Sequence, residues 1–502
     1  MRPSPRFAVL SLACALTSCA QLAHDGESNA TTQGRLEAAL QRMLADEALT
    51  NARIGVAVTD LATGASIVEH DANKGFVTAS NMKLVSTAVA LASLTPAFQW
   101  QTRVVAAPDS LTADGVVTGD VFLVGGGDPS LGGLPRARDG AGDGLDALAL
   151  QLRRRGVLRI TGTVRGDAGA EPFPIYGSGW QWDYLEEDYA APSAGLNYAH
   201  NVAEVRVQPT TAGDAATVSC TPDVDLPWLL LRVTTVKQGE PTRIRFHRVP
   251  HSECVVVEGS IAEGSAPYRV PVAVGDPAQF AAAAFVRALQ RRGITVDGDA
   301  PTSMRAPVGA VEIASHSSAP LAEIAVPLLM QSINLYAEQA WRAAAFYGMG
   351  LRTFADCERH CIATLTALGV PTAGMVLADG SGLSRRNLVS PRQLVALLAA
   401  MRKDSRLHAI QTGLPVAGES GTLRSRFMRG AAKGQVRAKT GFVSYVVALS
   451  GYVDRKDSAA PFAFSVLLNN FTCEPDRAKA AVDAFVEELA QCAGSSGATG
   501  DN

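Results

Sequence analysis

The stretch Ser80-Asn81-Met82-Lys83 places a serine three residues before a lysine, directly ahead of an apolar run (84–91) that predicts a helix. Residues i and i+3 lie on one face of a helix, about one turn apart. The Ser80 hydroxyl and the Lys83 amine are therefore expected to be neighbours. Burial lowers the pKa of a lysine amine, so that the amine can accept a proton at neutral pH. This stretch predicts a nucleophile and its base.

Two further motifs supply groups that such a pair needs for acyl transfer. Ser332-Ile333-Asn334 lies in an apolar segment that becomes helical, and Lys439-Thr440-Gly441 lies where a basic stretch runs into a strand. Ser332 can relay a proton to a leaving amine, and Asn334 can hold Lys83 and a substrate amide in register.

The third motif has the chemistry of a carboxylate site. Lys439 supplies a positive field that favours a substrate carboxylate and lowers the pKa of Lys83 further, and the Thr440 hydroxyl can bond that carboxylate. Gly441 lets a substrate backbone lie against the strand edge. Backbone N–H groups would form the oxyanion hole. Each motif alone is weak, since a lone Ser-x-x-Lys is usually a solvated helix turn; their order and context give the set its meaning.

Together the motifs resemble those of the penicillin-binding proteins and serine β-lactamases. Further stretches resemble the D-alanyl-D-alanine carboxypeptidase/endopeptidase branch, the class C low-molecular-mass penicillin-binding proteins. They are Val124–Leu131, Trp180–Asp183, Tyr189–Pro192, Asp379–Arg385, Leu414–Gly418 and Val436–Gly441. The resemblance extends over nearly all of residues 35–490, and it fits the long interval between Lys83 and Ser332, where that branch carries inserted domains.

The resemblance implies an α+β fold, in which a β-lactamase/transpeptidase-like domain has an antiparallel sheet flanked by helices and is interrupted by inserted, mostly-β domains. The distribution of predicted helices and strands along the 502-residue sequence agrees with this fold, because strand-like runs and Gly- or Pro-rich turns dominate between two helix-rich parts. The expected division is a signal peptide (1–19), a tether (20–34), the first part of the transpeptidase-like domain (35–97), the insertion (98–314), the second part of that domain (315–494) and a disordered tail (495–502).

Several elements are expected from hydrophobic periodicity. Arg53–His70 predicts a β-hairpin with a turn at Thr63-Gly64, Ala322–Tyr347 a long helix, and Tyr445–Val453 and Pro461–Asn469 two apolar strands.

By resemblance, Ser80 is the acyl-ester nucleophile, Lys83 the proton acceptor, and the backbone N–H groups of Ser80 and Phe442 the oxyanion hole. Phe442 departs from the family, which commonly has a Thr whose hydroxyl helps to hold the terminal carboxylate. Asp183 occupies the place of one of two neighbouring acidic residues that the family often has. The resemblance implies that one of these acids contacts the amine of the diaminoacid side chain of the substrate. Tyr184 occupies the second acid's place.

The N-terminus predicts export. Arg2 and Arg6 precede an apolar run (7–16) that is too short to span a bilayer, and Leu16-Thr17-Ser18-Cys19 looks like a bacterial lipobox. Cys19 would then carry the lipid that anchors the chain to a membrane, in a periplasmic location. Ordinary cleavage after Ala20 is the alternative.

Six cysteines beyond Cys19 suggest disulfides in an oxidising compartment. The expected pairs are Cys220–Cys254 and Cys473–Cys492, and with more strain Cys357–Cys361. The last pair could also be read with Glu358 and His360 as metal ligands, but no partner cluster completes a four-ligand site, so no metal is expected.

We interpret the chain as a serine DD-peptidase without a cofactor, acting on peptidoglycan stem peptides as a carboxypeptidase, an endopeptidase or both. β-Lactams should acylate Ser80. A net charge of −3 gives no reason to expect nucleic-acid binding, and the oligomeric state stays open. A wall-binding protein with little activity would be expected to lose one of the three motifs. A β-lactamase would need a compact chain and an efficient deacylating water, and the long insertion argues against it.

Overall fold

The computed structural model describes residues 32–133, 143–169, 171, 173–249, 252–456 and 460–495. The predicted signal peptide with Cys19, most of the tether and nearly all of the tail lie outside the described residues. Residues 32–34, which we assigned to the tether, already belong to a helix over residues 32–44.

A five-stranded antiparallel sheet joins the two ends of the chain. Its strands, in spatial order, are β17 (Val436–Val443), β18 (Val446–Val453), β19 (Phe462–Asn469), β1 (Arg53–Asp60) and β2 (Ser66–His70). The predicted hairpin is β1 and β2, and the two late apolar strands are β18 and β19. The hydrophobic pattern therefore predicted four of the five strands.

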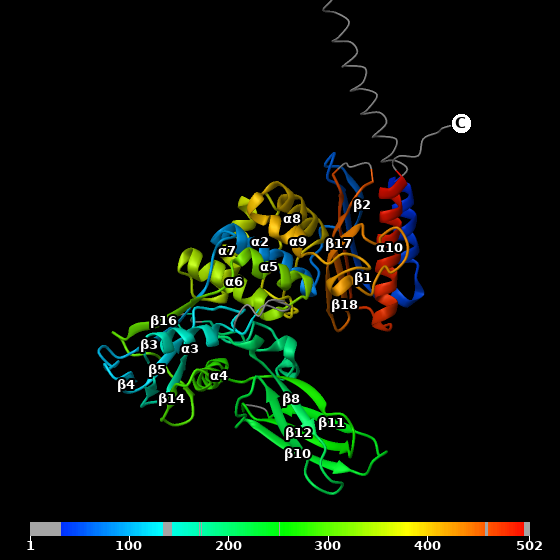
Figure 1. Ribbon diagram of the computed structural model, residues 1–502. Helices are drawn as coiled ribbons and strands as arrows, with labels where there is room; N and C mark the ends of the chain where they lie inside the picture. The colour runs from blue at the N-terminus through cyan, green and yellow to red at the C-terminus, as the bar shows by residue number, and fades with distance from the viewer. Residues whose placement is uncertain are drawn as a thin grey trace, which may run out of the picture.

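The sheet is covered on both faces (Figure 1). The N-terminal helix and α10 (Pro475–Ser495) cover one face, and a group of helices covers the other. That group comprises α2 (Met82–Leu94), α5 (Leu321–Met330), α6 (Asn334–Met349), α7 (Phe354–Ala367), α8 (Pro391–Lys403) and α9 (His408–Gly413). Because successive side chains of a strand point to opposite faces, Phe464 and Val466 enter the α10-side core, whereas Ala463 and Leu467 enter the other.

The long helix predicted over Ala322–Tyr347 is wrong, since the segment forms two helices. α5 ends at Met330, Ser332 has a left-handed φ of 63°, and α6 begins at Asn334. Pro327 lies inside α5 and lacks the N–H that would extend the helical bonding. The break leaves Ser332 outside both helices and makes Asn334 the first residue of α6.

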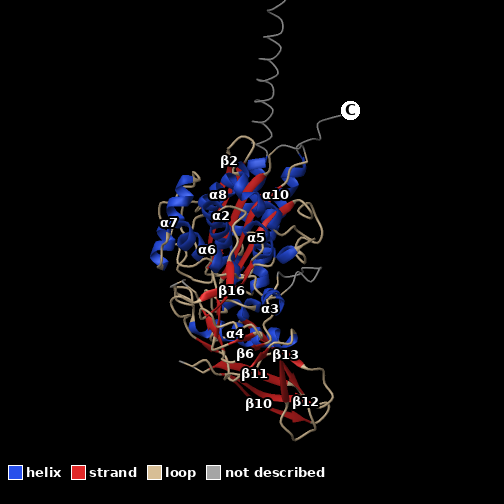
Figure 2. Cartoon of the chain, turned by 60° about the vertical axis from the view of Figure 1, so that its left-hand side comes forward, coloured by secondary structure: helices blue, strands red, loops and turns tan. Residues whose placement is uncertain are grey.

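A separate region occupies the interval between α2 and α5 and appears in the lower half of Figures 1 and 2. It has its own hydrophobic core, drawn from residues 104–314. One sheet runs in the order β15 (Thr302–Ser303), β7 (Val164–Asp167), β5 (Val121–Val124), β3 (Gln101–Ala106) and β16 (Val311–Ser317). Three smaller sheets have three strands each. One runs in the order β14 (Thr295–Val296), β6 (Arg159–Ile160) and β4 (Val116–Val117), and the second in the order β10 (Leu229–Val236), β12 (Val255–Ala262) and β11 (Arg243–Arg248). The third runs in the order β13 (Tyr268–Ala273), β8 (Val202–Gln208) and β9 (Thr217–Thr221).

The insertion also contains a helix that the sequence interpretation missed. α3 (Gly144–Arg154) buries Leu145, Leu148 and Leu152, at a spacing that fits one helical face. It lies in the chain between β5 and β7, which pair in parallel and therefore need a crossover connection. It makes this region less purely β than we expected, whereas α4 (Pro277–Arg291) agrees with the helix that the sequence predicts over residues 277–292. The boundaries at 98 and 314 stay predictions.

The expected disulfides are absent, because all six described cysteines are free. Cys473 precedes α10 and Cys492 lies near its far end, so the helix separates them by about 25 Å. Cys220 belongs to the β13–β8–β9 sheet and bonds the carbonyls of Pro222 and Val224, whereas Cys254 precedes β12 in another sheet. Cys357 and Cys361 are buried within α7, one turn apart, where a bridge is strained.

Truncating a side chain in the central strand tests this architecture. Leu467→Ala in β19 removes a fully buried side chain and should lower the free energy of unfolding by about 2–5 kcal/mol, through lost burial and the cavity left behind. Leu158→Ala makes the same change at a side chain that is 43% exposed and is the matched control. Urea unfolding curves measure both; equal losses would contradict the placement of Leu467.

Candidate active site

Ser80 and Lys83 stand side by side at the start of α2. Ser80 lies half-buried in a 3-10 turn, η2 (Ala79–Asn81), that leads into the helix. Ala79 holds a left-handed φ of 43° at the entry to this turn. Lys83 Nζ donates to Ser80 Oγ at 2.8 Å. The predicted pair is thus in direct contact.

Lys83 is enclosed by three segments of the chain. Besides Ser80, its Nζ donates to Asn334 Oδ1 at 2.5 Å and to the Ser381 carbonyl at 2.8 Å. The side chain is fully buried, and burial lowers the pKa of Lys83 to about 7 against the opposing pull of the Asp379 and Glu338 carboxylates. An amine with this pKa exchanges protons readily near neutral pH.

The Ser-x-Asn motif lies at the break between α5 and α6 and contacts Lys83 through Asn334. Ile333 caps α6 in an extended conformation, which directs Asn334 toward Lys83. The other end of that amide, Asn334 Nδ2, donates to the Tyr189 carbonyl at 2.6 Å. Asn334 therefore connects the nucleophile's helix with a segment of the insertion.

Lys439 comes from β17, on the strand face opposite the α10-side core that contains Ala438. Its Nζ donates to Ser332 Oγ and to the Thr440 carbonyl, each at 2.9 Å. Burial lowers the pKa of Lys439 well below its ordinary value, and the nearby Lys83 charge lowers it further. Two lysines thus share a small, desolvated space, and each disfavours the charge of the other.

Gly441 has a role in the protein's own packing. A Cβ there would lie 2.8 Å from the Thr78 carbonyl and 3.0 Å from Asn81 Nδ2. Asn81 Nδ2 also donates to the Lys439 carbonyl at 3.1 Å. The missing side chain therefore lets the Ser80 turn approach β17 closely.

β17 is an edge strand of the sheet, the position from which a strand can bind an extended peptide. Thr440 Oγ1 donates to Thr422 Oγ1 at 2.7 Å. Phe442 is 49% exposed, and Lys479 Nζ lies 5.0 Å from its ring centroid. Together these residues present a hydroxyl and then an aromatic ring along this edge.

The motifs border a cavity of about 320 Å³. Its lining consists of Ser80, Tyr184, Tyr189, Ser332, Asn334, Gly382, Leu383, Phe442, Val443 and Ser444. Asp183 is exposed and does not belong to this lining, whereas its neighbour Tyr184 does. Both lie in the 3-10 turn η3 (Trp182–Tyr184), where adjacent side chains point in different directions. The structure therefore does not bring Asp183 to the nucleophile.

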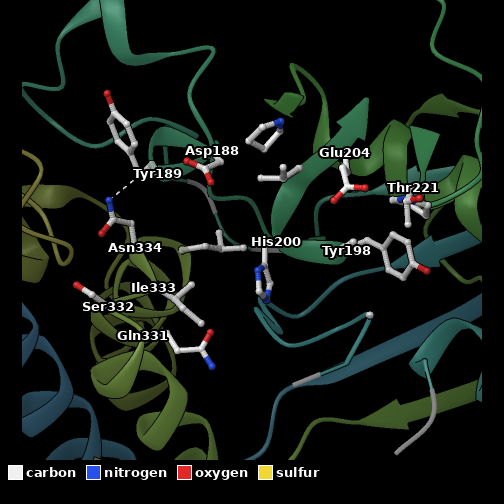
Figure 3. A pocket seen from close by; sticks show the side chains of 16 residues that line it. Asp188, Tyr189, Tyr198, His200, Glu204, Thr221, Gln331, Ser332, Ile333 and Asn334 are labelled. Carbon is white, nitrogen blue, oxygen red and sulfur yellow. Dashed lines mark hydrogen bonds between the residues drawn. The ribbon is translucent and has the colours of Figure 1, made fainter. Parts of the chain in front are cut away.

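A larger cavity of about 580 Å³ adjoins the first and shares Tyr189, Ser332 and Asn334 with it. Figure 3 shows it between the start of α6 and the insertion, with Asp188 above and Glu204 across from the Ser332–Asn334 segment. The nucleophile's cavity therefore opens toward the inserted region.

Sequence reasoning missed the part played by the loop between α7 and α8, which carries Asp379 and Ser381. Asp379 accepts hydrogen bonds from Trp180 Nε1, Ser381 Oγ, Gly382 N, Ser384 N and Asn387 Nδ2, at 2.6–2.9 Å. This network fixes the loop whose Ser381 carbonyl meets Lys83. The Asp379–Arg385 stretch was noticed as a family feature, but only the folded geometry places its backbone at the base.

Within the described residues, no group of three or more His, Cys, Asp or Glu side chains is arranged to hold a metal ion. The same residues include no helix of the length and apolarity needed to cross a membrane.

The lowered pKa of Lys83 has a consequence for stability. Between about pH 7 and the ordinary lysine pKa of 10.5, the unfolded chain binds the proton that the folded chain has released, so the stability of the native protein rises with pH across this window. In Lys83→Met this contribution is missing. The wild type should therefore gain melting temperature relative to Lys83→Met as pH rises from 7 to 10. Lys74→Met, at an exposed side chain, is the control; the same trend in both variants would contradict the burial argument.

Comparison with known proteins places this geometry in a family. The model of the D-Ala-D-Ala carboxypeptidase 3 (S13) family matches residues 36–492. The chain is 34% identical over 475 residues to a D-alanyl-D-alanine carboxypeptidase of Actinomadura sp. (strain R39), covering 91% of this chain and 84% of that protein. It is 25% identical over 393 residues to the D-alanyl-D-alanine carboxypeptidase DacB of Haemophilus influenzae, covering 77% and 79% of the two chains.

A solved structure extends the likeness to the fold. The crystal structure of penicillin binding protein 4 from Haemophilus influenzae superposes with a TM-score of 0.76 and 23% identity, covering 90% of this chain and 98% of that one. The expected transpeptidase-like fold with an insertion is thereby confirmed. The chain belongs to the D-Ala-D-Ala carboxypeptidase 3 (S13) family of serine peptidases.

Proposed function

We propose that this chain is a serine DD-peptidase that cleaves after the first D-alanine of a D-Ala-D-Ala end, or of a D-Ala–diaminoacid crosslink, through an ester on Ser80. The observation that carries the proposal is the 2.8 Å contact between Ser80 Oγ and a fully buried Lys83 amine, beside a cavity that also exposes Ser332 and Asn334. The names of the curated relatives supply the substrate, since both are D-alanyl-D-alanine carboxypeptidases.

In the first step, Ser80 Oγ attacks the carbonyl carbon of the scissile amide, and the hydroxyl proton passes to the neutral amine of Lys83. The carbonyl π electrons move to the oxygen, which the backbone N–H groups of Ser80 and Phe442 would hold. A pKa of about 7 makes the neutral amine available, which an ordinary lysine would not provide at this pH.

Collapse of this intermediate breaks the C–N bond. The leaving amine takes the proton that Lys83 received from Ser80, and Ser332 can relay it, because the Ser332 hydroxyl is held by Lys439 Nζ at 2.9 Å and borders the same cavity as Ser80. Lys83 thereby returns to its neutral form. The product amine is D-alanine in the carboxypeptidase reaction and the second stem peptide in the endopeptidase reaction. Water then attacks the Ser80 ester while Lys83, again neutral, accepts a proton from it, and that proton returns to Ser80 Oγ as the acyl–oxygen bond breaks.

Binding of the substrate follows from the edge strand and its charges. The peptide would lie along β17 in extended form, with its terminal carboxylate near Lys439 and the Thr440 hydroxyl. β-Lactams present a comparable carbonyl and carboxylate, and the Haemophilus influenzae penicillin binding protein 4 has been solved in complex with a novel β-lactam. Acylation of Ser80 by β-lactams follows from the same geometry.

The proposed setting is the periplasm, with the chain attached to a membrane through a lipid on Cys19. The support is the basic start at Arg2 and Arg6, the short apolar run, and the Leu16-Thr17-Ser18-Cys19 lipobox.

Covalent labelling with a fluorescent penicillin tests the central step. The wild type should give a stable adduct, Ser80→Ala none, and Lys83→Arg at least about a 10³-fold slower reaction, because a guanidinium does not deprotonate. Ser86→Ala, another serine of α2, is the matched control and should label normally. No adduct in the wild type would contradict the peptidase proposal, and rapid turnover of the label would indicate a β-lactamase instead.

Phe442 allows a test of carboxylate binding. Phe442→Thr adds a hydroxyl that can bond the free carboxylate, and a hydrogen bond to a charged group contributes about 1.5–3 kcal/mol. We expect kcat/KM for a peptide ending in D-Ala-D-Ala to rise about tenfold or more. Tyr268→Thr changes another exposed aromatic ring, in strand β13, that does not line the cavity, and should have little effect. Equal effects of both variants on kcat/KM would contradict a specific role for position 442.

A further inference from the structure

A buried carboxylate stands behind the catalytic base. Glu338 is fully buried in α6, one helical turn after Asn334. Residues four apart share a helix face, so Glu338 points to the same side as the amide that touches Lys83. Its Oε1 accepts from the backbone N–H groups of Gly380 and Ser381, at 2.8 and 2.9 Å.

These two hydrogen bonds reach Lys83 through a single residue. The N–H of Ser381 is held by Glu338, and the carbonyl of Ser381 accepts from Lys83 Nζ at 2.8 Å. Gly380 permits the close approach of the loop to α6, since a Cβ there would lie 2.5 Å from the Ala337 carbonyl. A shift of the Glu338 carboxylate would therefore displace the carbonyl that meets the base.

Glu338 has its own counterion one turn further along. Arg342 Nη2 lies 3.6 Å from Glu338 Oε2, and both side chains are at most 1% exposed. Arg342 Nη1 also donates to the Ser193 carbonyl of the insertion at 2.7 Å. A stripe of Asn334, Glu338 and Arg342 thus runs back from the active site along one face of α6.

We propose that Glu338 is a positioning residue that sets the orientation and basicity of Lys83, by holding the Ser381 carbonyl against the amine and by placing a buried negative charge behind it. The inference rests on the proposed role of Lys83 as proton acceptor.

The charges around Lys83 give the sign of the effect. Asp379 and Glu338 raise the pKa of Lys83, against the effect of burial. The positive group that interacts with Lys83 is Lys439 on β17, whose pKa the charge of Lys83 lowers. Glu338 itself faces Arg342 and Asp379, and burial raises its pKa to about 7, so its carboxyl carries the charge near and above neutral pH, where Lys83 loses its proton. Removing the Glu338 charge should therefore lower the pKa of Lys83, so that the neutral amine persists to lower pH.

The test is the pH profile of Ser80 acylation by a fluorescent penicillin, measured as a second-order rate constant. In Glu338→Gln the acid limb should move to lower pH by about half a unit or more, because the carboxylate is gone while an acceptor oxygen stays. Glu171→Gln is the matched control, because Glu171 is another buried carboxyl beside Arg342. The charges that act on Lys83 do not include Glu171, so the acid limb of the acylation profile should not move in this variant.

Glu338→Asp separates charge from position. It keeps the carboxylate but is one methylene shorter, so the acid limb should stay near its wild-type pH while the plateau rate falls by about tenfold or more. If Glu338→Gln does not fold, as judged by its melting curve, the Asp variant still decides, because a displaced acid limb with the charge retained would overturn the proposal.

An unchanged acid limb in a folded Glu338→Gln, or an equal shift in Glu171→Gln, would also overturn it. Failure of the function looks different. If wild-type Ser80 takes no label at any pH, the peptidase proposal fails; if the wild type labels and Glu338→Gln follows the same profile, only the role of Glu338 fails.

Discussion

The burial of one lysine amine constrains the whole site. Lys83 Nζ is surrounded by the nucleophile on its own helix, the amide of Asn334 and the carbonyl of Ser381. Taking an ammonium out of water is costly, and a low pKa is the usual response of a buried lysine. The surrounding acceptors and the more distant carboxylates reduce this cost enough to leave the pKa of Lys83 near neutral, where a base is useful. The burial that makes the charged form of Lys83 costly is therefore also what makes its neutral amine available as a base.

The fold provides the rigidity that this arrangement needs. The sheet presents Lys439 from β17, and the absence of a side chain at Gly441 lets the nucleophile's turn approach that strand. Helix α6 approaches from the other side, where Gly380 lets the Ser381 loop pack against it. Gly441 thus sets the distance between the Ser80 turn and β17, and Gly380 sets the distance between the Ser381 loop and α6. These are contacts that a methyl group would prevent.

Much of this fold and site could be predicted from the sequence, but the limits are specific. The three motifs, the strands β18 and β19, and the hairpin β1–β2 follow from local residue types and alternation. The break at Ser332 could not, because the apolar pattern on both sides continues at helical spacing and only the tertiary contacts favour a left-handed residue there. Glu338 and Ser381 gave no local signal either, since one reads as a helix residue and the other acts through its backbone. Helix α3 did carry a signal, in Leu145, Leu148 and Leu152, which the strand-rich surroundings obscured. The disulfide expectation failed because proximity along the chain does not place two sulfurs together across a long helix.

The groups that meet at Lys83 are spread over most of the chain. Ser80 precedes the insertion, Asn334 follows it, and Lys439 lies close to the C-terminal helix, while the Tyr189 carbonyl that holds Asn334 belongs to the insertion itself. A chain in the course of synthesis contains its nucleophile and base long before it contains the residues that enclose them. Until then Lys83 stays hydrated, and a hydrated lysine keeps its proton near neutral pH. If Ser80 and Lys83 act as proposed, the order of the motifs along the polypeptide delays the reactivity of Ser80 until almost the whole protein has folded.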